Sequence, residues 1–261
     1  VLTPQEVEIL FKTLRKLSAE GTAILYISHK LEEIRSLCDA ATILRLGKVV
    51  GHCIPRDTSA ADMAEMMVGS ARKPPQKAAG PVGDVLLELR GLSLPPASDF
   101  GMPLREISVS VRAGEVLGIG GVAGNGQDEL LSALSGEVQV PGGTVFFKGG
   151  DMGRLGPNAR RAAGLLTAPE ERLGHAAAPD MSLTENAMLT GAARQGLERN
   201  GLLNWGAARS FANQIIADFD VRTPGPGNAA RSLSGGNLQK FVIGREILQR
   251  PEVLVVNQPT R

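Results

Sequence analysis

A glycine-rich turn that runs directly into a helix is the feature that most constrains how this chain can fold. Residues 231–240 read Arg-Ser-Leu-Ser-Gly-Gly-Asn-Leu-Gln-Lys, and apolar residues at helical spacing continue to Leu248. A helix that starts behind such a turn directs free N–H groups and the positive end of its dipole at one point, beside the Ser234 hydroxyl. Ser234, Gly235 and Gly236 are therefore predicted to bind an anion such as a phosphate, unless the serine merely caps the helix.

Composition restricts the possible functions. The chain has 261 residues, 43% of them hydrophobic, which suits one large or two small domains. A formal net charge of +1 and an aromatic content of 3% argue against nucleic acid as a main partner, because neither a basic face nor a stacking platform is indicated. Cys38 and Cys53 lack metal-ligand spacing, and there is no signal peptide or long apolar run. We expect a reducing compartment, with any membrane contact made through a partner.

The start of the chain alternates between helix and strand patterns. Residues 4–21 are predicted to form a helix, because apolar residues recur at helical spacing and a final glycine supplies the C-cap. Residues 22–27 are a short apolar run, typical of a strand buried in a parallel sheet. His29 follows at the carboxyl end of that strand, where ligands gather in open α/β sheets. A lone histidine is more often structural, so His29 is a weak candidate by itself. Residues 59–68 predict another short helix.

The composition changes at residues 70–83, which are rich in Pro, Gly, Ala and Lys and show no apolar period. These residues are predicted to be a linker between a first domain at residues 1–69 and a second at residues 84–261. Residues 86–89 and 107–111 then predict two strands of an antiparallel edge. The sequence therefore indicates that the second domain starts with an antiparallel sheet.

A second glycine-rich loop follows a predicted buried strand at residues 115–120. Residues 121–128 read Gly-Val-Ala-Gly-Asn-Gly-Gln-Asp and precede a predicted helix. Glycines let successive N–H groups turn toward one anion, so a strand, such a loop and a helix together form a phosphate cradle. The alternative is a turn without a ligand. The candidate binding residues are Gly121, Gly124, Asn125, Gly126, Gln127 and Asp128.

The same loop leaves a dinucleotide-binding protein open as an alternative. Residues 118–123 also satisfy the fingerprint of a Rossmann oxidoreductase that uses NAD(P). That fold needs an acidic residue at the end of the next strand to bind the ribose. The next strand, predicted at residues 144–147, ends in Lys148. The Rossmann interpretation therefore lacks its ribose partner and does not explain the turn at Ser234.

The region from residue 182 to residue 221 is predicted to be mostly helical. Ser182 and Glu185 have the spacing of a capping box that opens a helix. Gly201 and Gly206 are expected to interrupt the helices that follow.

Beyond these arguments, the chain resembles ATP-binding cassette (ABC) ATPases. Residues 233–240, the helix after them and the apolar run at 251–256 are similar to the signature motif and Walker B strand of that family. Residues 258–261 are similar to the tandem ATPase subunits of bacterial nucleoside or simple-sugar importers. The resemblance implies an α/β fold: a P-loop NTPase domain of the ABC type with an antiparallel β edge subdomain and a helical subdomain. It also implies that the C-terminal part of another such domain comes first.

The resemblance assigns roles to particular residues. Residues 27–33 and the segment after them resemble the switch-histidine region, which implies that His29 is catalytic, contacts the γ-phosphate of ATP and helps to position the attacking water. Residues 1–4 resemble the end of a D-loop. Glu170 stands near the place of the Q-loop glutamine. Residues 182–221 would form the helical subdomain that receives the permease.

Four positions depart from the family's pattern. Gln127 replaces the phosphate-binding lysine and Asp128 replaces the magnesium-binding hydroxyl. Asn257 and Gln258 replace the Walker B aspartate and the glutamate that polarises water. A unit charge about 4 Å from a phosphate is worth roughly 4 kcal/mol at an effective dielectric near 20, so the loss of the lysine weakens binding. An amide is not a general base. We therefore predict a second nucleotide site that does not hydrolyse ATP.

The resemblance also implies partners and a location. The whole protein would use ATP and Mg²⁺ to drive membrane permease subunits from the cytoplasmic side of the inner membrane. A second ATPase domain or subunit, and indirectly a solute-binding protein, would take part. The chain is expected to be a fragment that ends at Walker B and has little ATPase activity by itself. The alternative is a soluble ABC-type ATPase of DNA repair or translation, although the basic or coiled-coil insertions typical of those proteins are missing.

A structural hypothesis concerns the apolar run at residues 23–27. These residues would form a strand beside residues 253–256 if the first domain docked on the second as a circular permutant. Burial of the run would gain roughly 25 cal/mol per Å². A linker of about 14 residues reaches roughly 45 Å at full extension, so its length allows the docking.

Overall fold

The computed structural model describes residues 4–45, 47–69, 82–96, 101–122 and 124–260. The chain divides into two compact units, Val1–Ala79 and Gly80–Arg261, and each is described by itself. Most of the expected linker at residues 70–83 lies outside the described residues, as do Ala123, Arg261 and residues 1–3 of the expected D-loop remnant.

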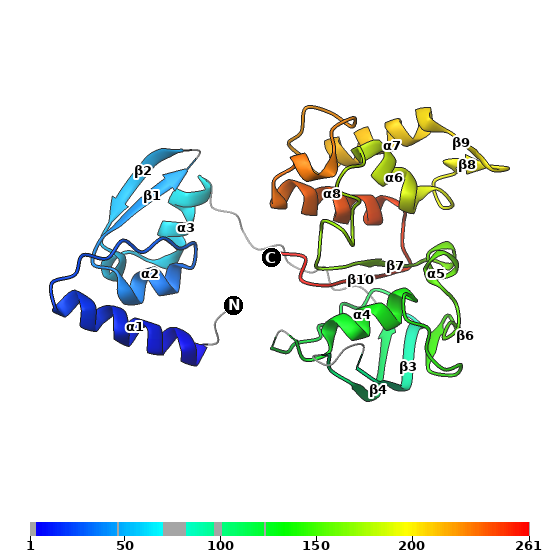
Figure 1. Ribbon diagram of the computed structural model, residues 1–261, viewed down its shortest axis with the longest axis horizontal. Helices are drawn as coiled ribbons and strands as arrows, with labels where there is room; N and C mark the ends of the chain where they lie inside the picture. The colour runs from blue at the N-terminus through cyan, green and yellow to red at the C-terminus, as the bar shows by residue number, and fades with distance from the viewer. Residues whose placement is uncertain (1–3, 46, 70–81, 97–100, 123, 261) are drawn as a thin grey trace. The chain divides into compact units, whose positions relative to one another are not determined.

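The first unit consists of helices and a β-hairpin. Its described elements are α1 (Pro4–Ala19), α2 (Leu31–Leu37), β1 (Ala41–Arg45), β2 (Lys48–Cys53), the 3-10 helix η1 (Pro55–Asp57) and α3 (Ala60–Val68) (Figure 1). The helices expected at residues 4–21 and 59–68 are confirmed as α1 and α3. Ser59 caps α3 by accepting the N–H of Asp62 at 3.0 Å, and Gly69 ends the helix with a left-handed φ of 86°.

The strand expected at residues 22–27 is wrong. These residues lie between α1 and α2 without strand structure, and the side chains of Leu25 and Ile27 are 89% and 87% exposed. A buried parallel strand needs neighbouring strands that accept and donate its backbone hydrogen bonds. Among the described residues of this unit, the sheet consists of β1 and β2, which pair with each other. Residues 23–27, which the docking hypothesis takes as a strand, therefore form none.

The second unit begins with the antiparallel sheet that the sequence predicts. Its strands are β3 (Val85–Leu94), β4 (Leu104–Arg112), β5 (Val145–Phe147) and β6 (Gly150–Asp151), in the order β4-β3-β5-β6. Alternate residues of β3, among them Leu87 and Leu89, are buried. They share a core with Leu130 and Leu134 of α4 (Gln127–Ser135). The sheet thus supports α4, the helix that follows the second glycine-rich loop.

A buried arginine holds the other end of α4. Arg160 lies on α5 (Pro157–Ala163), and its guanidinium donates hydrogen bonds to the carbonyls of Leu134 at 3.0 Å, Leu155 at 2.8 Å and Met152 at 2.7 Å. Leu134 is in the last turn of α4, where carbonyl groups lack helical partners and the dipole favours a cation. Arg160 therefore fixes α4 and, through it, the loop at the start of the helix.

Two parallel strands join the two lobes of this unit. β7 (Leu165–Ala168) pairs with β10 (Val253–Val256), Leu165 opposite Val253 and Ala168 opposite Val256. Figure 1 shows the pair between the lobe of α4, β3 and β4 and a lobe of helices. Both strands end at the same edge, so Glu170 and the residues after Val256 leave the sheet together.

The buried strand expected at residues 115–120 is also wrong. This segment has no strand structure, and the side chains of Val116 and Ile119 are 80% and 58% exposed. Within the described part of the chain, the parallel sheet of this unit contains β7 and β10 and offers the segment no pairing. Its apolar side chains therefore remain in solvent, as those of residues 22–27 do.

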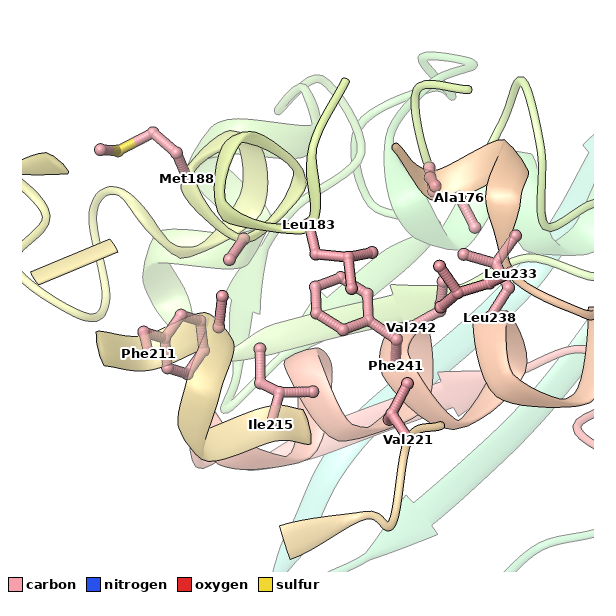
Figure 2. Packing of buried hydrophobic residues seen from close by; sticks show 14 of the residues in the cluster. Ala176, Leu183, Met188, Phe211, Ile215, Val221, Leu233, Leu238, Phe241 and Val242 are labelled. Carbon is pink, nitrogen blue, oxygen red and sulfur yellow. The ribbon is translucent and has the colours of Figure 1, made fainter. Parts of the chain in front are cut away.

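The helical lobe carries the turn with which the sequence analysis began. It contains α6 (Leu183–Gly191), the hairpin β8 (Glu198–Arg199) and β9 (Leu202–Leu203), α7 (Trp205–Asp218), the 3-10 helix η2 (Ala230–Ser232) and α8 (Gly235–Leu248). Figure 2 shows Leu183, Phe211, Ile215 and Phe241 converging between α6, α7 and α8. Burial of each such side chain stabilises the fold by about 1.5–3 kcal/mol. This core therefore holds the start of α8 in its position.

The ends of these helices confirm one expectation and correct another. The capping box is formed: Ser182 Oγ accepts the N–H of Glu185, and the Glu185 carboxylate accepts the N–H of Ser182 at 2.7 Å. Gly201, with a φ of 79°, interrupts the helices at the β8–β9 turn. Gly206 does not, because it is the second residue of α7 and follows the cap at Asn204. A glycine in a first turn lies where helical hydrogen bonds are not yet required.

Candidate functional site

A cavity of about 940 Å³ in the second unit brings six of the sequence-predicted residues together. It lies between the second glycine-rich loop and α4, the segment after β7, and the start of α8. The sequence-predicted residues that line it are Gly124, Gln127, Asp128, Glu170, Gly235 and Gln258. Residues more than 100 positions apart thus share one cavity, because the loop and the two strand ends meet at the same edge of the sheet.

The backbone of the second glycine-rich loop needs its glycines. Gly124 and Gly126 have φ angles of 85° and 101°, in the left-handed region that side chains disfavour. Gly126 is the N-cap of α4, which begins at Gln127. The loop therefore turns sharply into the helix, as a phosphate cradle would.

The Gln127 side chain folds back across this loop. Its Oε1 accepts the N–H of Asn125 at 3.0 Å, and its Nε2 donates to the carbonyl of Val122 at 3.0 Å. A Cβ built on Gly121 would lie 2.7 Å from Nε2, so the amide also rests against the start of the loop. The Asn125 N–H already has a partner. In this conformation the Asn125 N–H is not available to a nucleotide phosphate.

Two altered positions bind each other. Asn257 Nδ2 donates to Asp128 Oδ1 at 2.7 Å, which links the start of α4 to the end of β10. The backbone N–H of Asn257 donates to the carbonyl of Ala168 at 3.0 Å and continues the ladder between β10 and β7. Asp128 is thus engaged by a neutral amide. In the described ranges, no group of three or more His, Cys, Asp and Glu residues is arranged to hold a metal ion.

The segment after β7 adds an arginine and a histidine that the sequence analysis missed. Arg172 and His175 line the cavity with Glu170. Arg172 approaches the first turn of α8, because a Cβ built on Gly235 would lie 2.8 Å from its Nη1. His175 Nε2 lies 2.9 Å from Glu137 Oε1. Arg172 lies two residues after Glu170 in the sequence, but its proximity to Gly235 depends on the packing of two distant segments.

The turn at residues 234–236 leaves backbone donors open. Ser234 occupies the N-cap position of α8, but its hydroxyl caps no N–H and instead accepts Asn237 Nδ2 at 2.9 Å. The interpretation of Ser234 as a simple capping residue is therefore wrong. Among the described residues, the N–H groups of Gly235 and Gly236 have no hydrogen-bond partner. Gly236 is exposed, with nothing within 4 Å of a Cβ built on it. This helix start is free to receive an anion.

His29 belongs to the first unit and is exposed. Its neighbours form a hydrogen-bonded network around Glu33. Tyr26 Oη donates to the Glu33 carboxylate at 2.7 Å, and Lys30 Nζ lies 2.9 Å from it. Hydrogen bonds from Lys30 and then Tyr26 hold the pKa of Glu33 below its ordinary value, and the same bond to Glu33 raises the pKa of Tyr26. The network fixes the turn that bears His29.

Comparison with known families decides the identity of the fold. The family model described as "ABC transporter" matches residues 104–261, more than half of the chain. The chain belongs to the ABC transporter family. Two solved cassettes have the same fold at low identity. One is a nucleotide-free ATP-binding cassette from an ABC transporter, with a TM-score of 0.50, 20% identity and coverage of 68% of this chain and 70% of that one.

The other solved cassette is the dimeric ATP-binding cassette MJ0796, in a post-hydrolysis state with ADP and Pi. It has a TM-score of 0.53 and 18% identity, and the match covers 67% of this chain and 75% of that one. The expected ABC-type α/β fold is therefore confirmed. The Rossmann alternative has no support from the family match or from these folds.

Several relatives of this ABC-family chain are import proteins. The nucleoside import ATP-binding protein NupA of Lactococcus lactis subsp. cremoris is 36% identical over 100% of the chain and 52% of that protein. The guanosine import ATP-binding protein NupO of Bacillus subtilis is 37% identical, over 100% and 51%. The ribose import ATP-binding protein RbsA of Halalkalibacterium halodurans is 36% identical, over 100% and 51%. The chain thus spans about half the length of these curated relatives. None of the described helices of this ABC-family chain is both long and apolar enough to cross a membrane.

Proposed function

We propose that this chain is part of an ATP-binding subunit that drives the import of nucleosides or simple sugars through a membrane permease. The observation that carries the proposal is the start of α8, where the N–H groups of Gly235 and Gly236 are open in a chain of the ABC transporter family. The import relatives named above, which match the whole chain, support the direction of transport.

In this proposal the second domain gives its signature turn to a nucleotide that a companion domain holds. Ser234, Gly235 and Gly236 would bind the phosphates of that ATP with backbone N–H groups and a hydroxyl, and His29 would contact its γ-phosphate. ATP supplies the phosphoryl group whose transfer to water drives the transport cycle. The loop at residues 121–128 belongs to the opposite site, which we propose does not hydrolyse ATP, since Gln127 is hydrogen-bonded to the loop backbone and Asp128 to the Asn257 amide.

The proposal names partners outside this chain. Permease subunits would contact the helical lobe, a second ATPase domain or subunit would complete the ATP site, and a solute-binding protein would take part indirectly. The complex would lie at the cytoplasmic side of the inner membrane. Mg²⁺ would be bound with the ATP of the intact site. No described feature of the structure favours the alternative, a soluble ATPase of DNA repair or translation.

The test uses the complete transporter, reconstituted with its permease in proteoliposomes. A hydrogen bond to a charged acceptor is worth about 1.5–3 kcal/mol, so Ser234→Ala should lower the ATPase rate about tenfold to hundredfold. The matched control is Ser110→Ala, an exposed serine of β4 outside the helical lobe, which should leave the rate unchanged. An unchanged rate in the Ser234→Ala transporter would contradict the proposal. The chain alone should show no ATP turnover above background.

A further inference from the structure

We propose that Gln127 is an internal ligand of the second glycine-rich loop and that its carboxamide blocks phosphate binding there. The inference deepens the proposed function and rests on it, because it explains why the opposite site, which we propose does not hydrolyse ATP, binds phosphate poorly. The loss of the lysine alone leads to a different expectation. The loop should still bind phosphate weakly through its remaining N–H groups, and a polar side chain nearby should strengthen that binding.

The hydrogen bonds of Gln127 contradict that expectation. A phosphate held by this loop would need the N–H groups that point into it, and Gln127 Oε1 accepts one of them, from Asn125 at 3.0 Å. The Nε2 group donates to the Val122 carbonyl on the other side of the loop at 3.0 Å. One side chain therefore bridges the loop, with an acceptor facing a donor and a donor facing an acceptor.

Few side chains could replace glutamine in this arrangement. Lysine has donors only and cannot accept the Asn125 N–H, while an ionised glutamate has acceptors only and cannot donate to the Val122 carbonyl. A carboxamide of this length satisfies both groups without a net charge. The close approach of Nε2 to Gly121 also uses the space that a Cβ would take there.

The neighbouring pair adds to the block. Asp128 follows Gln127 in the first turn of α4, and Asn257 holds its carboxylate at the end of β10. A phosphate that entered the loop would have to displace the Gln127 amide and tolerate the Asp128 charge. The two residues act differently. Gln127 occupies the N–H group, and Asp128 repels the anion.

The test is binding of ATP to the full chain, with Gln127→Ala as the decisive variant. Because the wild-type loop must release its own carboxamide before it binds phosphate, removal of that group should tighten ATP binding about fivefold, the ratio that corresponds to one ordinary net hydrogen bond. Gln127→Glu keeps an acceptor for the Asn125 N–H and adds a negative charge, so it should bind ATP more weakly than wild type. Gln214→Ala, an exposed glutamine on α7, is the matched control and should leave the affinity unchanged.

Hydrogen exchange at Asn125 provides a readout that needs no nucleotide. Its amide should exchange about fivefold faster in Gln127→Ala than in wild type, because the Oε1 acceptor is gone. Equal exchange rates, or equal or weaker ATP binding by Gln127→Ala, would overturn the inference. Neither result would affect the proposed function, whose test is the Ser234-dependent ATPase rate of the complete transporter. If that rate did not depend on Ser234 while Gln127→Ala still opened the loop, the inference would stand and the proposed function would fail.

Discussion

At the scale of single residues, three of the four departures from the family pattern take part in specific hydrogen bonds. The sequence predicts that Gln127, Asp128, Asn257 and Gln258 are each unsuited to ATP hydrolysis. The structure adds that Gln127 is hydrogen-bonded to the backbone of its own loop and that Asn257 donates a hydrogen bond to Asp128. A sequence read position by position cannot show this pairing, because residues 128 and 257 meet only after β10 has been placed beside β7.

The Asp128–Asn257 bond leads to a prediction about charge. Asn257→Asp would place a second carboxylate beside Asp128, so the free energy of unfolding should fall by about 1 kcal/mol at neutral pH. Exchange of the two residues, Asp128→Asn with Asn257→Asp, should restore most of that loss, since one amide again donates to one carboxylate. Urea unfolding of the two single variants and the double variant measures the coupling. A double variant no more stable than Asn257→Asp would show that the bond contributes nothing.

At the scale of elements, local patterns succeed, but two of the expected buried strands fail. α1, α3 and the antiparallel pair β3–β4 form as expected, because helical spacing, caps and alternation act through near neighbours. Residues 22–27 and 115–120 have equally clear apolar runs but form no strands. An apolar run indicates that a segment could be buried between two strands. Whether it is buried depends on neighbouring strands that other parts of the chain must form.

The capping box of α6 gives a prediction at this scale. Ser182→Ala removes an N-cap side chain and should lower the free energy of unfolding by about 1 kcal/mol, with Ser210→Ala as the neutral control. The pKa of Glu185 is held below its ordinary value by the Ser182 hydroxyl and then by the Ser182 backbone N–H. Urea unfolding at neutral pH measures the difference between the variants.

The pH dependence of this cap has a definite sign. Because the pKa of Glu185 is lower in the folded state, its contribution is complete at pH values above the unfolded pKa of about 4.3 and is lost as the pH falls through the folded value. Glu185→Gln should therefore be less stable than wild type at neutral pH, and the difference should shrink below about pH 4. A difference that does not change with pH would contradict an ionic role for this carboxylate.

At the scale of the whole second unit, a buried ionic cluster connects the lobes. Glu246 of α8 is completely buried and bonds Arg161 of α5 and Arg245 of its own helix, the latter at 2.9 Å. Burial lowers the pKa of Arg245, and the Glu246 carboxylate opposes that effect. Arg245 also donates to the carbonyl of Ala176 at 2.8 Å. The cluster fixes α8, and with it the signature turn, relative to the segment that bears Arg172.

Glu246→Gln tests this cluster. The change removes the buried carboxylate that faces both guanidinium groups, so the free energy of unfolding should fall by about 3–5 kcal/mol. The exposed Glu198→Gln on β8 is the control and should stay within about 0.5 kcal/mol of wild type. Thermal or urea unfolding measures both, and a Glu246→Gln loss no larger than that of the control would mean that the cluster does not stabilise the unit.

The sequence by itself determined the local elements and the chemistry of each motif: a glycine-rich turn at a helix start, a loop that needs glycines at Gly124 and Gly126, and amides where acids were expected. These depend on backbone sterics and on side-chain type, which act within a few residues. The tertiary structure alone decided which of those groups meet: Gly235 with Arg172, and Asn257 with Asp128. It also decided that two apolar runs stay exposed, because burial and long-range hydrogen bonds need a partner that no local pattern can provide.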